Sequence, residues 1–409
     1  MNVLVVNAGS SSLKYQLFDT NTETVFAKGI CERIGIDGSA IEHKQLVKGL
    51  VASEERPMKN HAEAMSLVVE KLLDKEYGCI SSMDEIEAVG HRVVHGGAYF
   101  SESVLLNDDV LAKLRLCHDF APLHTPAHIQ GIEGCLAVMP DKPQVLVFDT
   151  AFHQTMKPEA FMYALPYELY RDYGVRRYGA HGTSHRFVAG EMLKILGKTE
   201  GTKIVTCHIG NGSSISAVKD GKVMDTSMGF TPLAGVEMGT RCGDIDPAIV
   251  PFMMEKLNLT PAGVSDLMNK KSGFLGVTSG YSSDSRDLQK AISEGPSNPH
   301  HEQAKLAIDI LKLQLKKFIG AYAAEMNGVD AIVFTAGIGE NSTTLREAVL
   351  SDLDYLGVDL DKELNAKITR QSNNVKISTD KSKVAVYVIP TNEELLIARD
   401  TAALVSAKG

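Results

Sequence analysis

Long apolar runs, basic runs and paired cysteines are all missing from this sequence of 409 residues. Its longest apolar runs fall far short of the ~20 residues that a membrane-spanning helix needs. The six cysteines form no C-x-x-C pair and most lie in apolar surroundings, which predicts reduced cysteines in the core. The net charge is −9 with no lysine- or arginine-rich run, so we expect neither nucleic acid nor an anionic membrane as a partner.

The start of the chain lacks the basic segment that opens a secretory signal. Met1, Asn2 and Val3 lead directly into an apolar strand pattern. We therefore expect a cytoplasmic location. The chain is also longer than the size at which one hydrophobic core usually stops growing, so two domains are expected.

Two common nucleotide-binding signatures are missing as well. No G-x-x-x-x-G-K-[ST] is present, because the tripeptide Gly197-Lys198-Thr199 has no glycine at the required upstream position. The H-R-D and D-F-G elements of protein kinases are also missing. An ATP site in this chain would need another architecture.

The most informative pattern that is present lies at the beginning of the chain. Two antiparallel strands are expected around residues 7–12, a turn of small residues, hydroxyls and one amide. Its backbone N–H groups could approach an anion closely, and Ser10 and Ser12 could donate further hydrogen bonds. Lys14 follows on the same face. The pattern predicts a phosphate-binding hairpin, and an ordinary hairpin with a surface lysine is the open alternative.

The same succession returns in the middle of the chain. Residues 203–219 predict a strand, a turn of glycine, asparagine and serine, and a second strand, and Asp220-Gly221 predicts a hairpin into a third. Residues 2–30 have the same order of strands and turns. Two such meanders, each followed by helices and strands, predict an internal duplication with two phosphate-binding hairpins facing each other across a cleft.

Apolar periodicity predicts the remaining elements. A polar segment is expected between the third strand and the first helix. Residues 337–341 are expected to form a turn before a helix that begins near Ser342, where a nucleotide could lie against bare backbone, although Gly-x-Gly also serves ordinary turns. We expect helices over residues 60–73, 108–117, 126–138, 300–326 and 393–405, and further strands over 86–90, 145–148, 329–334 and 384–389.

Three loops rich in glycine each carry a cationic or donor side chain. Arg92 lies among apolar residues and glycines, where a buried guanidinium would favour a bidentate anion, or a structural ion pair. His181 and Arg241 have similar surroundings, and the three together suit an anionic transition state better than a purely structural role. Asp149 ends an apolar strand, which is a common position for catalytic residues.

Eight motifs carry a resemblance to a known family. In this order and over the whole chain, they are similar to the acetokinase family, within the superfamily of acetate and sugar kinases, hsp70 and actin. The motifs are N-A-G-S-S-S-x-K at 7–14, H-R-V-V-H-G-G at 91–97, F-D-T-A-F-H at 148–153, R-R-Y-G-A-H-G-T-S-H at 176–185, H-I-G-N-G-S-S at 208–214, M-G-T-R-C-G-D-I-D-P at 238–247, G-I-G-E-N at 337–341 and P-T-N-E-E at 390–394.

The resemblance implies an α/β fold of two duplicated ribonuclease H-like (actin-like ATPase) domains with a central cleft. The first would comprise residues 1–150 and 386–409, and the second, which would bind the nucleotide and form a homodimer, residues 151–385. The implied activity is reversible, direct in-line transfer of the ATP γ-phosphoryl group to acetate, giving acetyl phosphate and ADP, with Mg²⁺ or possibly Mn²⁺ as the metal.

The resemblance also implies roles for individual residues. Arg92 would bind the acetate carboxylate, and His181 and Arg241 would stabilise the transition state. The metal would be held by Asn7 and Glu393. The nucleotide would be bound by Ser10, Ser12, Lys14, His208, Ile209, Gly210, Asn211, Gly212, Asp284, Ser285, Arg286, Gly337, Ile338, Gly339, Glu340 and Asn341.

Asp149 is the essential acid that the resemblance implies. Acetate is already ionised at pH 7, since its pKa is roughly 4 to 5, so we expect Asp149 to orient Arg92 or a metal-bound water instead of accepting a proton. The family places the acyl group against Val94, Leu123 and Pro232. Ala180 stands where some members have phenylalanine, which predicts appreciable use of propionate.

Two other functions remain open from the sequence. A kinase that prefers propionate or butyrate would differ from an acetate kinase only in its relative rates on the three acids. An actin-like or hsp70-like ATPase would share the duplicated domains but would lack a turnover that depends on a carboxylic acid.

Overall fold

The computed structural model describes residues 1–122, 124–369 and 373–408. The chain divides into two compact units, Met1–Gln154 with Asn392–Gly409, and Thr155–Thr391. The first is called the terminal unit below and the second the middle unit. Both have a mixed sheet covered by helices, and their boundaries fall a few residues beyond those expected from the sequence.

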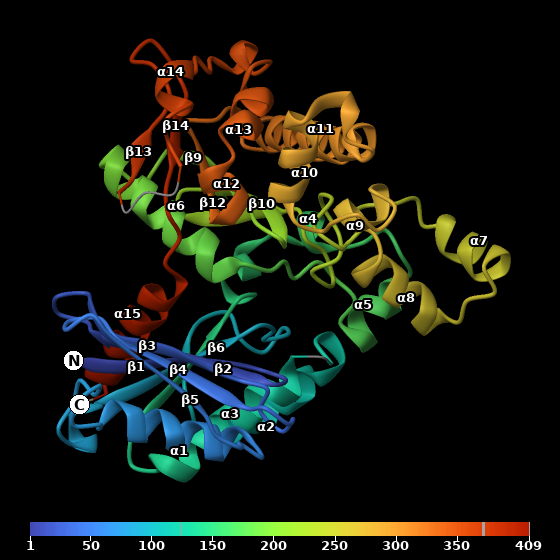
Figure 1. Cartoon of the computed structure of the whole chain (residues 1–409). Coiled ribbons are helices and arrows are strands. Elements are labelled where there is room, and N and C mark those ends of the chain that lie inside the picture. Colours follow the sequence, from blue (N-terminus) through green and yellow to red (C-terminus); the bar gives the residue numbers. More distant parts are fainter. Residues whose placement is uncertain (123, 370–372, 409) are drawn as a thin grey trace. The chain divides into compact units, whose positions relative to one another are not determined.

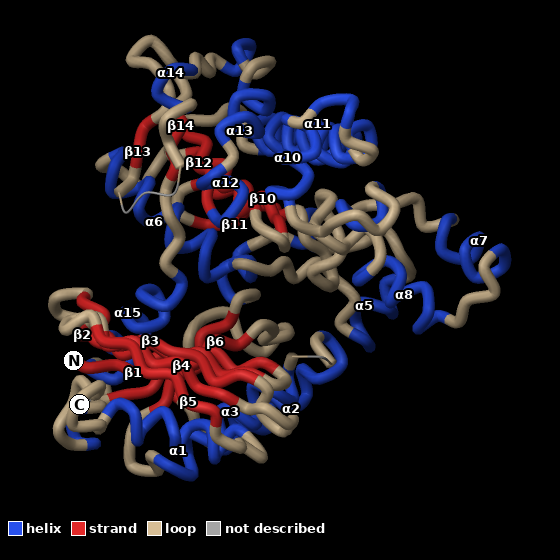
Figure 2. The backbone as a smooth tube through the Cα atoms, viewed as in Figure 1, coloured by secondary structure: helices blue, strands red, loops and turns tan. Residues whose placement is uncertain are grey.

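The sheet of the terminal unit has eight strands in the order β5-β4-β3-β2-β1-β6-β8-β7. The first five strands form an antiparallel meander, β6 and β8 run parallel to β1 and to each other, and β7 is an antiparallel edge. The red strands of this unit lie side by side as one sheet in Figure 2. The strands are β1 (Asn2–Gly9), β2 (Ser12–Asp19), β3 (Thr24–Glu32), β4 (Ala40–Gln45), β5 (Leu50–Glu55), β6 (Ala88–Val93), β7 (Val104–Leu105) and β8 (Gln144–Phe148).

Two expectations for the terminal unit were wrong. The turn expected over residues 7–12 is shorter, because only Ser10 and Ser11 separate β1 from β2. The expected polar segment contains β4 and β5, which apolar periodicity could not reveal, because two of the three buried residues of β4 are polar. One of them is His43, whose Nδ1 lies 2.6 Å from the buried Tyr15 hydroxyl.

Helices cover both faces of this sheet. They are α1 (His61–Leu72), α2 (Asp108–Leu116), α3 (Thr125–Val138) and α15 (Glu393–Ser406). Helices α1 and α3 pack together on one face, and α15, from the end of the chain, packs against β1, β6 and β8 on the other (Figure 1). Gly90 permits this approach, since a Cβ there would lie 2.4 Å from Thr401 Oγ1 of α15. The C-terminal helix thereby brings Glu393 to the strands that carry Asn7 and Arg92.

The sheet of the middle unit repeats this topology in the order β11-β10-β9-β12-β14-β13. Its meander has three strands instead of five, and it likewise has two strands parallel to its first strand and an antiparallel edge. The predicted internal duplication is confirmed. The strands are β9 (Lys203–Ile209), β10 (Ser213–Lys219), β11 (Lys222–Thr226), β12 (Ala331–Thr335), β13 (Val375–Lys376) and β14 (Ala385–Val388).

The long helix α11 supplies much of the core of the middle unit, with Leu311, Leu315 and Ile319 fully buried. Residues 336–341, expected as a turn, form a short helix directly after β12, and Ser342 then caps the next helix by accepting a hydrogen bond from Leu345 N. The helices are α4 (Pro158–Phe161), α5 (Tyr167–Tyr173), α6 (Gly182–Leu196), α7 (Ile249–Lys256), α8 (Pro261–Lys270), α9 (Gly273–Val277), α10 (Ser285–Ser293), α11 (His301–Glu325), α12 (Ala336–Asn341), α13 (Thr343–Leu350) and α14 (Lys362–Asn365).

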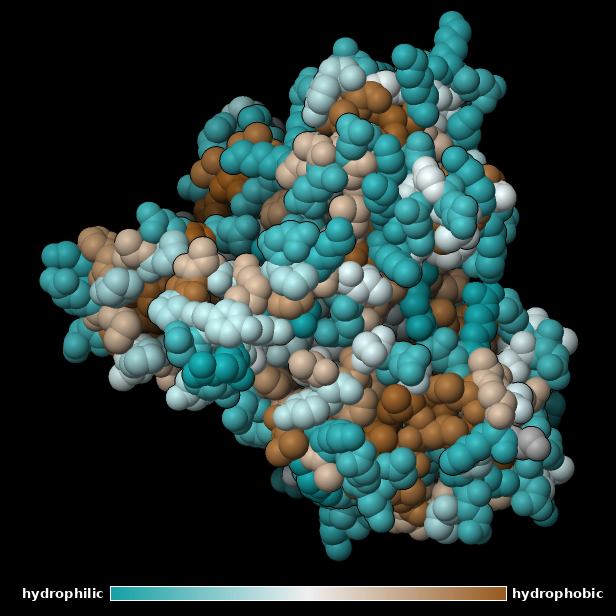
Figure 3. All heavy atoms as spheres, turned by 180° about the vertical axis from the view of Figure 1, so that it is seen from behind, coloured by the Kyte–Doolittle hydropathy of each residue, from teal (hydrophilic) through white to brown (hydrophobic). Residues whose placement is uncertain are grey.

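Hydrophilic side chains cover most of the face drawn in Figure 3, and hydrophobic ones gather in separate areas. None of the helices in the described part of the chain combines the length and apolar character that crossing a membrane requires. The six cysteines are free thiols, four of them buried and two half-buried, which agrees with the expected reduced state.

Candidate functional site

The terminal unit contains an ion pair between Arg92 and Asp149. Arg92 lies on β6 and Asp149 directly follows the neighbouring parallel strand β8. Arg92 Nη2 is 2.8 Å from Asp149 Oδ2, and Arg92 Nε is 3.3 Å from Oδ1 and 3.2 Å from Oδ2. The Asp149 charge raises the pKa of Arg92 above its usual range. Nη1 of Arg92 has no hydrogen-bond partner among the described residues, so the guanidinium keeps one edge for a further anion.

Glu393 brings an acid to the same end of this sheet, at the first turn of α15. Burial raises its pKa to about 7, and the nearby Arg92 charge opposes this. Within the described part of the chain, its Oε1 atom is buried with no hydrogen-bond partner. An uncompensated buried carboxylate oxygen is costly, so a cation is the group that fits beside it. No set of three or more His, Cys, Asp or Glu side chains in the described ranges is arranged to hold a metal. Mg²⁺ suits such a sparse site, because it usually keeps several waters and binds substrate phosphates.

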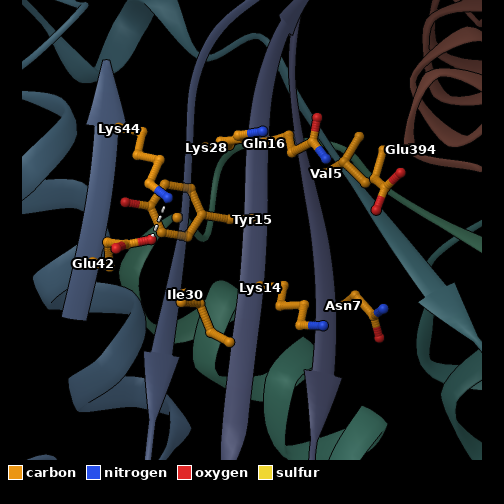
Figure 4. Close-up of a pocket in the computed structure, with 11 residues that line it drawn as sticks. Val5, Asn7, Lys14, Tyr15, Gln16, Lys28, Ile30, Glu42, Lys44 and Glu394 are labelled. Carbon is orange, nitrogen blue, oxygen red and sulfur yellow. Dashed lines mark ion pairs between the residues drawn. The ribbon is translucent and has the colours of Figure 1, made fainter. Parts of the chain in front are cut away.

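Asn7, the second expected metal ligand, lies directly opposite Lys14 in the pairing of β1 with β2. Both line a cavity of about 220 Å³ that Glu394 of α15 enters from the other side (Figure 4). Farther along the same cavity Lys28 lies near the Lys44–Glu42 ion pair, whose Nζ–Oε1 distance is 2.7 Å. The amide and the ammonium are therefore placed together, as a phosphate and metal site would need.

Ser10 and Ser12, the two hairpin serines expected to bind the nucleotide, do not line that cavity. Ser10 is exposed at the tip and lines a separate cavity of about 390 Å³ with Asn60 and His61. Ser12 is half-buried opposite Gly9, whose carbonyl oxygen lies 2.8 Å from His61 Nε2. In the terminal unit, only Asn7 and Lys14 of the expected hairpin residues share one cavity.

In the middle unit, most of the expected nucleotide-binding residues line one cavity of about 580 Å³. Gly337 leaves it open, since an added Cβ would meet no atom within 4 Å. Asp284 caps α10 by accepting a hydrogen bond from Arg286 N, 2.8 Å away, and the Arg286 side chain lowers the pKa of Asp284. The cavity is lined by Gly210, Asn211, Ser283, Asp284, Ser285, Arg286, Gln289, Gly337, Ile338, Asn341 and Ser342.

Three of the residues expected to bind the nucleotide have structural positions away from this cavity. Ile209 is fully buried in the core, and Gly339 packs near the carbonyl oxygen of Cys207. Glu340 is buried, and its Oε1 accepts from the backbone N–H groups of Ala336 at 2.9 Å and Thr391 at 3.3 Å. These three residues therefore support the walls of the cavity and do not line it.

Three lining residues were missed from the sequence: Ser283, Gln289 and Ser342. Gln289 follows Ser285 by four positions on α10 and so lies on the same helix face, and its Nε2 donates to Ser342 Oγ at 2.7 Å. Helical spacing on α10 was the signal that could have identified it.

His181 and Arg241 meet at Gly212 in the second hairpin. A Cβ added at Gly212 would lie 3.3 Å from His181 Nε2 and 3.4 Å from Arg241 Nη1. His181 precedes α6 with a positive φ of 59°, and its ring stacks on His208 with 4.1 Å between centroids. The middle unit thereby gathers a guanidinium and two imidazoles beside a turn that has no side chain in the way.

Arg241 is held by backbone groups. Its Nη1 donates to Pro232 O at 3.1 Å, and burial lowers its pKa. The loop that carries it packs tightly on Gly273, where φ is +60° and a Cβ would lie 2.0 Å from Met238 O. Among the described residues, Arg241 forms no ion pair with a carboxylate, which leaves its charge available to a ligand.

The expected acyl-binding residues are divided between the two units. In the terminal unit Val94 follows β6, and its N–H donates to His128 Nε2 at 3.2 Å. In the middle unit Pro232 contributes the carbonyl that holds Arg241, and Ala180 is buried with Met228 and Met238. Leu123 lies outside the described residues.

Known proteins are similar to this chain over almost its whole length. The model of the acetokinase family matches residues 2–399. Among curated relatives, the acetate kinase of Fusobacterium nucleatum is 59% identical over 98% of this chain and 99% of the relative, and that of Halothermothrix orenii is 52% identical over 100% of both.

Solved structures agree as well. The acetate kinase of Porphyromonas gingivalis has a TM-score of 0.94 at 46% identity and covers 99% of both chains. A propionate kinase from Francisella tularensis has a TM-score of 0.89 at 40% identity, over 98% of this chain and 99% of that one. These similarities extend over the whole chain, so they include both sheets and the residues placed around them.

Proposed function

This chain belongs to the acetokinase family, and from that premise we propose that it transfers the γ-phosphoryl group of ATP reversibly to acetate, giving acetyl phosphate and ADP. Full-length identity to acetate kinases makes it a phosphotransferase with a carboxyl group as acceptor. The observation that carries the residue-level proposal is the meeting of His181 and Arg241 at Gly212. Two donors beside a bare turn suit the terminal phosphate of a nucleotide.

The chemistry of the step explains why these residue types are needed. Phosphoryl transfer passes through a loose, metaphosphate-like transition state with charge on three equatorial oxygens, so catalysis depends on positioning and electrostatic stabilisation. We assign that stabilisation to His181 and Arg241. The cavity lined by Asp284, Gly337 and their neighbours would hold the adenosine. Direct in-line attack by acetate needs no protein nucleophile.

Arg92 and Asp149 are assigned to the acetate. The free edge of the Arg92 guanidinium would bind the acetate carboxylate, and Asp149 would hold that guanidinium in one orientation. Because acetate is already ionised at neutral pH, its attack requires no base. Asp149 thus acts through Arg92 as a positioning residue.

Asn7 and Glu393 would hold a divalent cation, Mg²⁺ or Mn²⁺. The fit rests on the buried and unpartnered Oε1 of Glu393 within the described chain. When bound, such an ion neutralises charge on the β- and γ-phosphate oxygens. Lys14, opposite Asn7, would add a further positive charge for the phosphates.

A hydroxamate assay tests the activity. With ATP and Mg²⁺, acetyl phosphate should form only when acetate is present, and it should drive ATP formation from ADP in the reverse direction. ATP hydrolysis that does not depend on acetate would instead support an actin-like or hsp70-like ATPase. Rates on acetate, propionate and butyrate distinguish the near alternative, a kinase that prefers propionate or butyrate. The propionate kinase from Francisella tularensis is 40% identical, less than the curated acetate kinases at 52% and 59%, so acetate is the expected preferred acid.

We also propose an oligomeric state and a cellular location for this protein. The family resemblance supports a cytoplasmic homodimer whose contacts come from the middle unit, and closure of the cleft on nucleotide. Light scattering coupled to size-exclusion chromatography measures the mass directly. A mass near that of one 44.3 kDa chain would contradict the dimer.

A further inference from the structure

We infer that Ser214, His185 and Thr206 form a hydrogen-bond chain that fixes which ring nitrogen of His181 carries a proton, and that they are positioning residues for His181. The inference rests on the proposed function only for its effect on catalysis. All four residues belong to the middle unit.

The hydrogen-bond chain begins at a backbone carbonyl inside the sheet. Thr206 Oγ1 lies 3.4 Å from the carbonyl oxygen of Ser216, which can only accept a hydrogen bond. Thr206 therefore donates to that carbonyl and accepts from His185 Nδ1, 2.7 Å away. Since Nδ1 then carries the proton, the neutral His185 ring has its lone pair at Nε2.

The same order of donors and acceptors continues from His185 to His181. His185 Nε2 lies 2.7 Å from Ser214 Oγ, so the lone pair at Nε2 accepts the Ser214 hydroxyl proton. Ser214 Oγ then accepts from His181 Nδ1, at 2.9 Å. Thr206, His185 and Ser214 are fully buried, which holds the chain away from competing water. His181 thus has its proton on Nδ1, the nitrogen turned away from Gly212.

This arrangement determines what His181 presents to a phosphate. Its Nε2 is the atom beside Gly212 and Arg241. With Nδ1 committed to Ser214, a neutral His181 would direct a lone pair at a phosphoryl oxygen. Only the imidazolium, which donates through both nitrogens, can stabilise the transition state there. The hydrogen-bond chain therefore makes the catalytic contribution of His181 depend on its second proton.

Two further charged or titratable groups of the middle unit, His208 and Arg241, face His181. His208 stacks on its ring, and its Nδ1 lies 2.7 Å from Ser184 Oγ, which donates to Thr391 Oγ1. Arg241 approaches from the loop after β11. Neither bonds to Ser214, so a Ser214 variant leaves both of these groups chemically unchanged.

The tautomer can be measured directly. Nitrogen-15 spectra of histidine-labelled enzyme, with the His181 signal assigned from a His181→Gln variant, should show a protonated Nδ1 in the neutral ring. This is the minor tautomer of free histidine, so its presence would be distinctive. A neutral His181 protonated at Nε2 would overturn the inference, whatever the enzyme's activity.

Kinetics provide the second readout. Ser214→Ala removes the acceptor that stabilises the imidazolium. We expect kcat to fall roughly 10-fold or more and the alkaline limb of its pH profile to move about one unit lower, with little change in KM for ATP or acetate. His185→Gln should move the limb in the same direction. A fall in kcat with an unmoved alkaline limb would show a merely structural role and overturn the inference.

Thr226→Val is the matched control. It removes a fully buried hydroxyl on the adjacent strand β11, which bonds Ser216 Oγ at 2.8 Å and does not contact His181. It should leave the pH profile in place. If the wild-type enzyme formed no acetyl phosphate, the proposed function would fail, and the nitrogen-15 spectra would still confirm or refute the hydrogen-bond chain.

Discussion

Arg92 and Asp149 form a forked ion pair across two parallel strands, with 2.8 Å between Nη2 and Oδ2. Asp149 is only 1% exposed, and its carboxylate is committed to the guanidinium. In the proposed reaction the nucleophile is already ionised, so it gives Asp149 no proton to remove. This geometry favours an orienting role for Asp149 over proton acceptance.

Asp149→Asn tests that role. We expect kcat/KM for acetate to fall roughly 10²- to 10³-fold, because the Arg92 guanidinium loses the charge that fixes its orientation. The loss should be the same from pH 6 to pH 9 when activity is measured at saturating ATP. Recovery of the rate at high pH would contradict the orienting role, because it would mean that the wild-type residue removes a proton.

The proposed role of Glu393 as a metal ligand predicts that metal binding depends on pH. The pKa of Glu393 is raised to about 7 by burial, so the carboxyl is largely protonated at pH 6 and ionised at pH 8. We expect the dissociation constant for Mg²⁺ to decrease by roughly 10-fold over that interval, since only the carboxylate binds the cation. Titration calorimetry with ADP present measures it. Glu393→Gln should abolish the dependence and Glu394→Gln should retain it, and a flat profile in the wild type would refute the assignment.

The raised pKa of Glu393 also predicts how the free energy of unfolding depends on pH when no metal is bound. Because burial raises the folded-state pKa of Glu393 above the ordinary glutamate value of 4.5, the folded protein binds more protons than the unfolded chain between pH 4.5 and about 7. Glu393 therefore favours folding at the acid end of this window and loses that contribution as pH rises through it. Urea unfolding of wild type and Glu393→Gln, compared across the window, isolates this contribution from other groups.

Gly273 supports the loop of Arg241. In Gly273→Ala, the new Cβ would be 2.0 Å from Met238 O and 2.7 Å from Arg241 O, so the loop must move and kcat should fall at least ~10-fold. Gly280→Ala is a matched control, with a φ of +87° and no atom within 4 Å of its Cβ position. Both should lose about 1–2 kcal/mol of stability from the left-handed backbone. Equal kcat in the two variants would show that the loop does not depend on this packing.

Ala180 is expected to influence the choice of acid. It is 4% exposed and packs with Met228 and Met238. We predict appreciable propionate turnover in the wild type. Ala180→Phe should reduce the propionate-to-acetate ratio of kcat/KM by roughly 10-fold, within the 1–3 kcal/mol that one methylene is worth. Ala180→Gly should not reduce it. An unchanged propionate-to-acetate ratio in the phenylalanine variant would show that Ala180 does not belong to the acyl site.

The cavity at α12 predicts a nucleotide-specific defect. Gly337 lines the cavity assigned to adenosine, and a Cβ added there would meet no protein atom within 4 Å, so we expect a larger side chain to project into that space. Gly337→Val should raise the KM for ATP roughly 10-fold, while the KM for acetate and the melting temperature stay nearly constant. Equal increases in both KM values would argue against an adenosine site there.

Local signals explain which parts of the fold were predictable. Helix α1 follows its expected range because apolar spacing coincides with the capping residue Asn60, whose side chain accepts from Glu63 N. Strand β4 was missed because its buried residues include His43 and Gln45, and burial of polar groups depends on partners distant in sequence, such as Tyr15. Helix α12 was missed because two glycines suggested a turn.

The candidate site, like the fold, was predictable from the sequence only in part. His181 and Arg241 stand out in the sequence, but Gly212, which brings them together, is recognisable as their shared neighbour only in the folded sheet. Glu340 was expected at the nucleotide, and its carboxylate instead bonds the backbone of Ala336 and Thr391. A motif identifies which residues matter to a family, while long-range contacts decide what each side chain touches.

We propose above all that His181 and Arg241 stabilise the phosphoryl group in transfer while Arg92 binds the acetate that attacks it. A crystal structure with Mg²⁺, ADP, acetate and a planar phosphate mimic tests it most directly. We predict that His181 Nε2 and the Arg241 guanidinium donate to the mimic while Arg92 binds the acetate beside it. A bound mimic with any of the three side chains beyond hydrogen-bonding reach of the mimic or the acetate would contradict the claim.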